Sequence, residues 1–140
     1  MSADSNKSVV RRYRELHNQN RLDLLGEVLD PGFNAHNMLP GLPGGLDGAR
    51  MAHQGFMAAF PDATATTDDL VAEGDRVVER YTLTGTNTGP FMGMPATGKP
   101  IRTGSIAIYR LANGKIVEHW GEHDGLGVMM QLGLMPAPGQ

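Results

Sequence analysis

The chain has 140 residues, a formal net charge of −3 and no cysteine. Because one domain usually has roughly 100–200 residues, we expect a single domain over residues 1–140. The negative charge argues against nucleic-acid binding, and the lack of cysteine excludes disulfides, thiol nucleophiles and cysteine metal sites. No apolar stretch approaches the roughly 18 residues of a membrane span, and the polar N-terminus lacks the apolar core of a signal peptide. We therefore expect a cytoplasmic protein that contacts no membrane.

The first half of the chain has the pattern of helices. Apolar spacing and helix-breaking residues predict helices over residues 5–20, 23–29 and 47–60. Tyr13 lies on the apolar stripe of the first helix, Asp47 can cap the third, and Pro61 ends it. Between the second and third helices, residues 33–38 are predicted to be extended and to lead into a glycine-rich loop.

From residue 63 onward the pattern is that of strands. Alternating or threonine-rich segments predict strands over residues 64–71, 77–86, 101–111 and 115–124. A glycine- and proline-rich loop over residues 87–99 separates the second strand from the third, and a helical pattern over residues 126–132 closes the domain. This order predicts an α+β fold, with the helices packed on one face of a curved antiparallel sheet.

The last two strands are predicted to form a hairpin around Asn113-Gly114, which strongly favours a two-residue turn. Such a turn pairs Ala112 with Lys115, and the register then continues along both strands. One face then carries three opposed pairs: Asp124 with Thr103, Glu122 with Ser105, and Trp120 with Ala107. Small residues opposite a tryptophan and two carboxylates predict a hollow with an aromatic wall, while His119 and His123 fall on the other face. A single bulge would exchange the two faces.

Asp124, at the end of this hairpin, is the candidate catalytic residue. A carboxyl group in an apolar pocket, here against Trp120, can take a proton from the carbon next to a carbonyl and later return one. The alternative is that Asp124 only caps the terminal helix, which begins just after it. The two roles are compatible.

Six further residues are candidates for contact with a substrate: Tyr13, His36, Phe56, Phe91, His119 and Trp120. His36 either polarises a carbonyl at the mouth of a cavity or is a surface loop histidine. Tyr13 either lines that cavity or lies in the core with its hydroxyl paired. Phe56 and Phe91 offer apolar surface for a flat ligand, or they make ordinary core and dimer contacts.

The histidines do not indicate a metal site. His119 and His123 are four residues apart on a predicted strand, which separates them by about 13 Å at roughly 3.3 Å per residue. Ligand bonds near about 2 Å cannot bridge that distance to one ion. We expect a structural, dimer-interface or substrate-orienting role for these two, and surface positions for His17 and His53. No phosphate-binding loop is present, because Gly98-Lys99 is followed by proline.

Several segments resemble the SnoaL-like polyketide cyclases of the nuclear-transport-factor-2-like (NTF2-like) superfamily. They are Ala-Phe-Pro-Asp at residues 59–62, Glu-Gly-Asp-Arg-Val-Val at 73–78, the glycine-rich stretch at 85–99 and Gly-Lys-Ile-Val-Glu-His-Trp at 114–120. The resemblance implies a cone-shaped α+β fold and a homodimer. It also implies a cofactor-free intramolecular aldol ring closure, with Asp124 as the acid–base. Many close relatives have histidine in the segment where this chain has Asn87, which cannot titrate.

The leading hypothesis is therefore a cofactor-independent enzyme that closes a ring in a bulky, largely apolar carbonyl or ester substrate. Two alternatives remain open. One is another enzyme on the same scaffold, such as an epoxide hydrolase, an isomerase or an accessory hydroxylation protein. The other is a protein that binds an apolar small molecule without turning it over.

Overall fold

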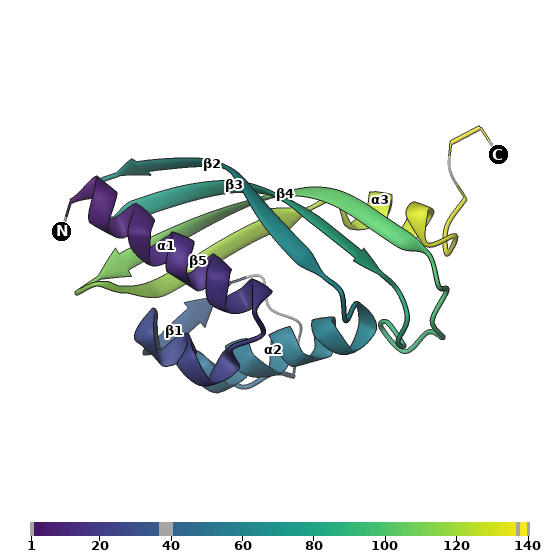
Figure 1. Cartoon of the computed structure of the whole chain (residues 1–140), viewed down its shortest axis with the longest axis horizontal. Coiled ribbons are helices and arrows are strands. Elements are labelled where there is room, and N and C mark those ends of the chain that lie inside the picture. The colour runs from purple at the N-terminus through teal and green to yellow at the C-terminus, as the bar shows by residue number, and fades with distance from the viewer. Residues whose placement is uncertain (1, 37–40, 137, 140) are drawn as a thin grey trace.

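The computed structural model describes residues 2–36, 41–136 and 138–139. Its elements in chain order are α1 (Ala3–Asn18), the short 3-10 helix η1 (Leu22–Glu27), β1 (Leu29–Ala35), α2 (Gly45–Ala59), β2 (Thr64–Glu73), β3 (Arg76–Thr86), β4 (Pro100–Ala112), β5 (Lys115–His123) and α3 (Gly125–Gln131). The predicted α+β class is confirmed. The helices α1 and α2 lie on one side of a curved sheet, and α3 lies near the far end of β4 (Figure 1).

Among the described residues the sheet has five strands in the order β1-β5-β4-β3-β2, and only the pair of β1 with β5 is parallel. The sequence predicted a helix up to residue 29, but η1 ends at Glu27 and β1 begins at Leu29. The helix is replaced because Leu29 already pairs with Ile116 of β5 as the first residue of β1. The edge position of β1 tolerates Pro31. Residues 37 and 38 of the predicted extended stretch lie outside the described residues.

Two apolar clusters hold the helices on the sheet. The larger joins α1, η1 and β1 to the sheet around side chains that are fully buried: Val10, Leu16, Leu29, Val77 and Ile116. The smaller joins the C-terminal end of α2 to β4 and α3, through Phe60, Ile101, Val128 and Leu132. Between the two clusters, the inner face of the sheet is more polar.

The β4–β5 hairpin has the predicted turn but not the predicted faces. Ala112 pairs with Lys115 as expected, but Val117 is an extra residue on β5, and the register shifts by one beyond it. Trp120 therefore pairs with Ile108 and lies on the outer face of the sheet. A slip of one residue turns every following side chain to the opposite face.

Candidate active site

The inner face of the sheet consists of rows of side chains that cross β3, β4 and β5. The rows are Val77, Tyr109 and His119; then Glu79, Ala107 and Gly121; then Tyr81, Ser105 and His123. Ser105 is 5% exposed, whereas Ile106 on the opposite face is 51% exposed. The histidines of β5 are therefore in register with the inner face, where His119 is half-buried and His123 is exposed. The prediction that Trp120 and Glu122 lie on this face is wrong, because of the bulge at Val117.

A buried ion pair joins α1 to this face. The Arg14 guanidinium donates from Nε and Nη2 to the two carboxylate oxygens of Glu79, over 3.1 and 2.7 Å. Glu79 also accepts hydrogen bonds from the hydroxyls of Tyr109, at 2.6 Å, and Thr67, at 2.7 Å. Burial raises the pKa of Glu79, but the hydrogen bonds and charge of Arg14, with those two hydroxyls, leave the pKa below its ordinary value. Arg14 and Glu79 therefore form a buried, ionised pair on the inner face of the sheet.

Two histidines from different helices meet next to this ion pair. Nδ1 of His53 on α2 lies 2.8 Å from Nε2 of His17 on α1. His53 is 5% exposed and His17 is half-buried, so the predicted surface positions are wrong. Burial, and then the charge of Arg14, lowers the pKa of both imidazoles. Both rings are therefore neutral at neutral pH.

His119 extends over the inner face from β5. Its ring centroid is 5.3 Å from that of Tyr109 and 6.3 Å from that of Phe33. The imidazole leans over Gly121, where a Cβ would come within 2.9 Å of Cε1 of His119. Burial, and then the charge of Arg14, lowers the pKa of His119 to about 4. A neutral imidazole thus faces the interior of the protein.

Asp124 follows β5 directly and is the N-cap of α3. Its side chain accepts a hydrogen bond from the backbone N–H of Gly127 at 2.8 Å, which confirms the capping role. A side chain at position 127 would displace this carboxylate, because a Cβ would lie 2.2 Å from Oδ2 of Asp124. The carboxylate is exposed, so the predicted apolar surroundings are wrong. Trp120, the residue predicted to make these surroundings apolar, lies on the outer face of the sheet.

Trp120 and His36 lie together on the outer side of the sheet. Their rings stack, with centroids 4.7 Å apart and planes 6° from parallel. His36 Nε2 is 2.7 Å from a carboxylate oxygen of Glu118, and the Arg76 guanidinium lies 5.2 Å from the indole centroid. The prediction that Trp120 lines an interior hollow is therefore wrong, because the bulge turns it outward. Of the two positions expected for His36, the surface position is the one observed.

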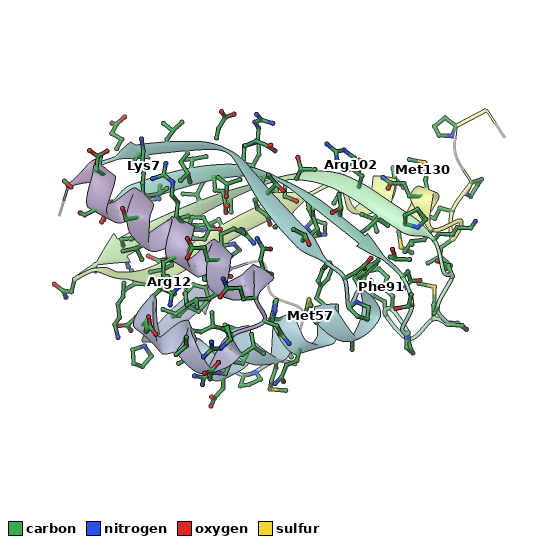
Figure 2. The ribbon with its side chains drawn as sticks, in the orientation of Figure 1. Lys7, Arg12, Met57, Phe91, Arg102 and Met130 are labelled. Atoms are coloured by element: carbon green, nitrogen blue, oxygen red, sulfur yellow. The ribbon has the colours of Figure 1, made fainter. Side chains whose placement is uncertain are left out.

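Three other predicted contact residues do lie on the helix side of the sheet. The Tyr13 ring meets the edge of Tyr109 at 5.9 Å. Phe56 and Phe91 pack on Phe60 at 5.0 and 5.2 Å. Phe91, labelled in Figure 2, is in the loop after β3 and lies by the C-terminal end of α2. Each residue has packing partners within the chain, and each remains a candidate for contact with substrate.

Asn87 has a structural role in this chain. Its side chain is fully buried and donates to the backbone oxygens of Gly89, at 2.8 Å, and Ala59, at 3.3 Å. Its Oδ1 accepts from the backbone N–H of Thr97 at 2.9 Å. These bonds fasten the loop between β3 and β4 to the end of α2, and they need an amide rather than an imidazole.

A hollow of about 380 Å³ opens between α1 and β2, away from the predicted site residues, and Arg14, Asn18, Thr67 and Asp68 are among its lining. Within the described residues, no three histidine or acidic side chains are grouped closely enough to hold a metal ion. In the same part of the chain, no helix has the length and apolarity needed to cross a membrane.

Known proteins share both the sequence pattern and the fold. The family model of the SnoaL-like polyketide cyclases matches residues 7–132. Aklanonic acid methyl ester cyclase DauD of Streptomyces sp. (strain C5) is 32% identical over 130 residues, which cover 89% of this chain and 80% of the relative. The structure of TsrD from Streptomyces laurentii matches with a TM-score of 0.88 at 32% identity, over 96% of this chain and 99% of that one. IdmH from Streptomyces antibioticus matches with a TM-score of 0.80 at 33% identity, over 91% and 98%. These matches confirm the family that the sequence resembles, and the chain belongs to the SnoaL-like polyketide cyclases.

Proposed function

We propose that this protein is a polyketide-cyclase-type enzyme that closes a carbon ring in a bulky, largely apolar carbonyl ester. The observation that supports this most strongly is the match to an aklanonic acid methyl ester cyclase over 89% of the chain. The neutral imidazoles and aromatic rings on the inner side, such as His119 and Tyr13, suit a flat, uncharged guest. From His119 to Asp124 the chain advances about 16 Å at roughly 3.3 Å per residue, a span that suits several fused rings.

The proposed reaction is an intramolecular aldol closure, so the product has the same atoms as the substrate. A base removes a proton from the carbon next to one carbonyl, and the resulting enolate attacks a second carbonyl carbon. One carbon–carbon bond forms, and the new alkoxide takes a proton back from the same protein group. No electrons are gained or lost, so the reaction needs no redox cofactor, and the proposal assigns no cofactor and no metal.

We assign the proton transfer to Asp124. It follows His123, an exposed residue in register with the inner face, and its carboxylate is open to an incoming molecule. The hydrogen bond from Gly127 occupies one oxygen and leaves the second for the proton. Because an exposed carboxylate is a poor base, the apolar substrate itself has to exclude water from this group when it binds.

The proposal includes a homodimer. Ile106 and Val71, both on the outer face of the sheet, are 51% and 62% exposed. A second copy of the chain would cover this apolar surface. Light scattering on the purified protein measures its molar mass in solution. The molar mass of a monomer at the concentration used in the activity assay would contradict the homodimer. Action in the cytoplasm also remains part of the proposal.

The direct test is incubation with aklanonic acid methyl ester, followed by mass spectrometry and NMR of the product. We expect a product of unchanged mass with one additional ring. Asp124→Asn should lower turnover by about 10²–10⁴-fold, the usual contribution of an acid–base group, while Asn still caps α3. Glu122→Gln, on the outer face, is the matched control and should behave as wild type. Unchanged turnover in folded Asp124→Asn protein would contradict the assignment.

A second candidate function is a carrier or sensor that binds an apolar molecule without converting it. The exposed, cap-engaged carboxylate of Asp124 favours this alternative, because such a group needs no catalytic role. Recovery of the ester unchanged from wild-type protein, with equal affinity in Asp124→Asn, would support the binder and refute the cyclase.

A further inference from the structure

The contact between His17 and His53 is not used in the reaction proposed above. Nδ1 of His53 lies 2.8 Å from Nε2 of His17, and the ring centroids are 3.8 Å apart. Nε2 of His53 is buried and has no hydrogen-bond partner among the described residues. Unpaired buried polar atoms are rare in folded proteins, so this one constrains how the two rings hold their hydrogens.

Only one of the two nitrogens in contact can bear a hydrogen. If His17 donated from Nε2, neutral His53 would have to place its own hydrogen on the buried, unpaired Nε2. If His53 donates from Nδ1, that Nε2 is only a bare lone pair, and proteins tolerate an unpaired acceptor better than an unpaired donor. A free imidazole slightly favours the Nε2–H form, but the buried unpaired donor outweighs this preference. The second arrangement leaves the hydrogen of His17 on Nδ1.

We propose that His53 is a positioning residue that fixes His17 as a hydrogen-bond donor from Nδ1, and that this donor recognises a carbonyl or phenolic oxygen of the flat substrate. The substrate class rests on the proposed function, whereas the positions of the hydrogens do not.

The surroundings of His17 fit this role. It lies one helical turn after Tyr13, with ring centroids 5.8 Å apart, and Tyr13 in turn meets Tyr109 on the inner face of the sheet. In the described part of the chain, the contact with His53 is the only hydrogen bond of the His17 ring. The charged group that faces the pair from α1 is Arg14, and it disfavours a second positive charge on either imidazole. The pair is therefore a neutral donor and not an acid.

NMR of protein labelled with ¹⁵N-histidine at neutral pH reports the positions of the hydrogens directly. We expect His17 and His53 both to carry hydrogen at Nδ1 and to have a bare Nε2. The variants His17→Gln and His53→Asn assign the signals. Spectra in which both rings carry hydrogen at Nε2 would overturn the proposal, whatever the ligand.

Binding of aklanonic acid methyl ester tests the recognition, in Asp124→Asn protein so that turnover does not interfere. His53→Asn keeps an N–H donor at the place of Nδ1, whereas His53→Leu removes it. We expect Kd within about twofold of the parent for the asparagine variant and about five- to tenfold weaker for the leucine variant, the range of one neutral hydrogen bond. Equal Kd in the two folded variants would overturn the positioning role. If the Asp124→Asn protein does not bind the ester, the proposed substrate is refuted. The positions of the hydrogens are then tested by the NMR spectra, which need no ligand.

Discussion

The ion pair of Arg14 with Glu79 gives the sharpest prediction for stability. Glu79→Leu would leave the Arg14 guanidinium, whose side chain is 8% exposed, without its carboxylate. Loss of one partner of a buried ion pair costs about 3–5 kcal/mol. Against the roughly 5–15 kcal/mol of a typical domain this is a large fraction, and Tm should fall by roughly 10–20 °C.

Urea denaturation followed by Trp120 fluorescence measures this loss, because Trp120 lies on the outer face away from the change. The matched control is the double variant Arg14→Met with Glu79→Leu, which removes both charges. It should recover part of the stability, because apolar replacement of a whole buried pair is often nearly neutral, whereas the buried hydroxyl of Tyr109 loses both of its partners. A loss below about 1 kcal/mol in Glu79→Leu would refute the reasoning, since the charge left behind would then be costing almost nothing.

Three further changes follow from the site geometry. Asp124→Ala should lower the unfolding free energy by about 1 kcal/mol through loss of the α3 cap, whereas Asp124→Asn should lower it by less than about 0.5 kcal/mol; equal losses in denaturant titrations would contradict the cap. Gly121→Ala should displace the imidazole of His119, because the new Cβ meets the ring at 2.9 Å; unchanged His119 NMR signals would argue against this contact. The pKa of His119 is about 4 in the folded protein, below its ordinary value of 6.5. The unfolded chain therefore binds more protons between these pH values, and stability should fall as the pH drops from 6.5 towards 4. His119→Gln should flatten this slope in unfolding measurements across the range, and an unchanged slope would contradict the shifted pKa.

The fold class was predictable because it depends on local patterns. Helical spacing around Tyr13 and the Asn113-Gly114 turn are each encoded within a few neighbouring residues. The faces of β5 were not predictable in this way. The bulge at Val117 adds one residue to an otherwise regular strand, and nothing in the alternation on either side marks it. That one residue placed His119 inside and Trp120 outside, opposite to the prediction.

The histidine pair was missed for a different reason. His17 follows Tyr13 by four residues and His53 precedes Phe56 by three, so helical spacing does place both near apolar stripes. The expectation of surface positions for both histidines is wrong despite this spacing. Their contact with each other depends on how α1 and α2 pack, which no local pattern specifies. The structural role of Asn87 could not be predicted from the sequence either, because its hydrogen-bond partners include Ala59 at the end of α2 and Thr97, ten residues further along the chain.

Proton transfer by Asp124 can be measured separately from ring closure. Aklanonic acid methyl ester is incubated with the protein in D₂O, and NMR follows the hydrogen on the carbon next to the carbonyl. Wild-type protein should replace this hydrogen with deuterium, and Asp124→Asn should do so at least about 10²-fold more slowly. Exchange at the wild-type rate in folded Asp124→Asn protein would contradict the assignment of this residue as the base.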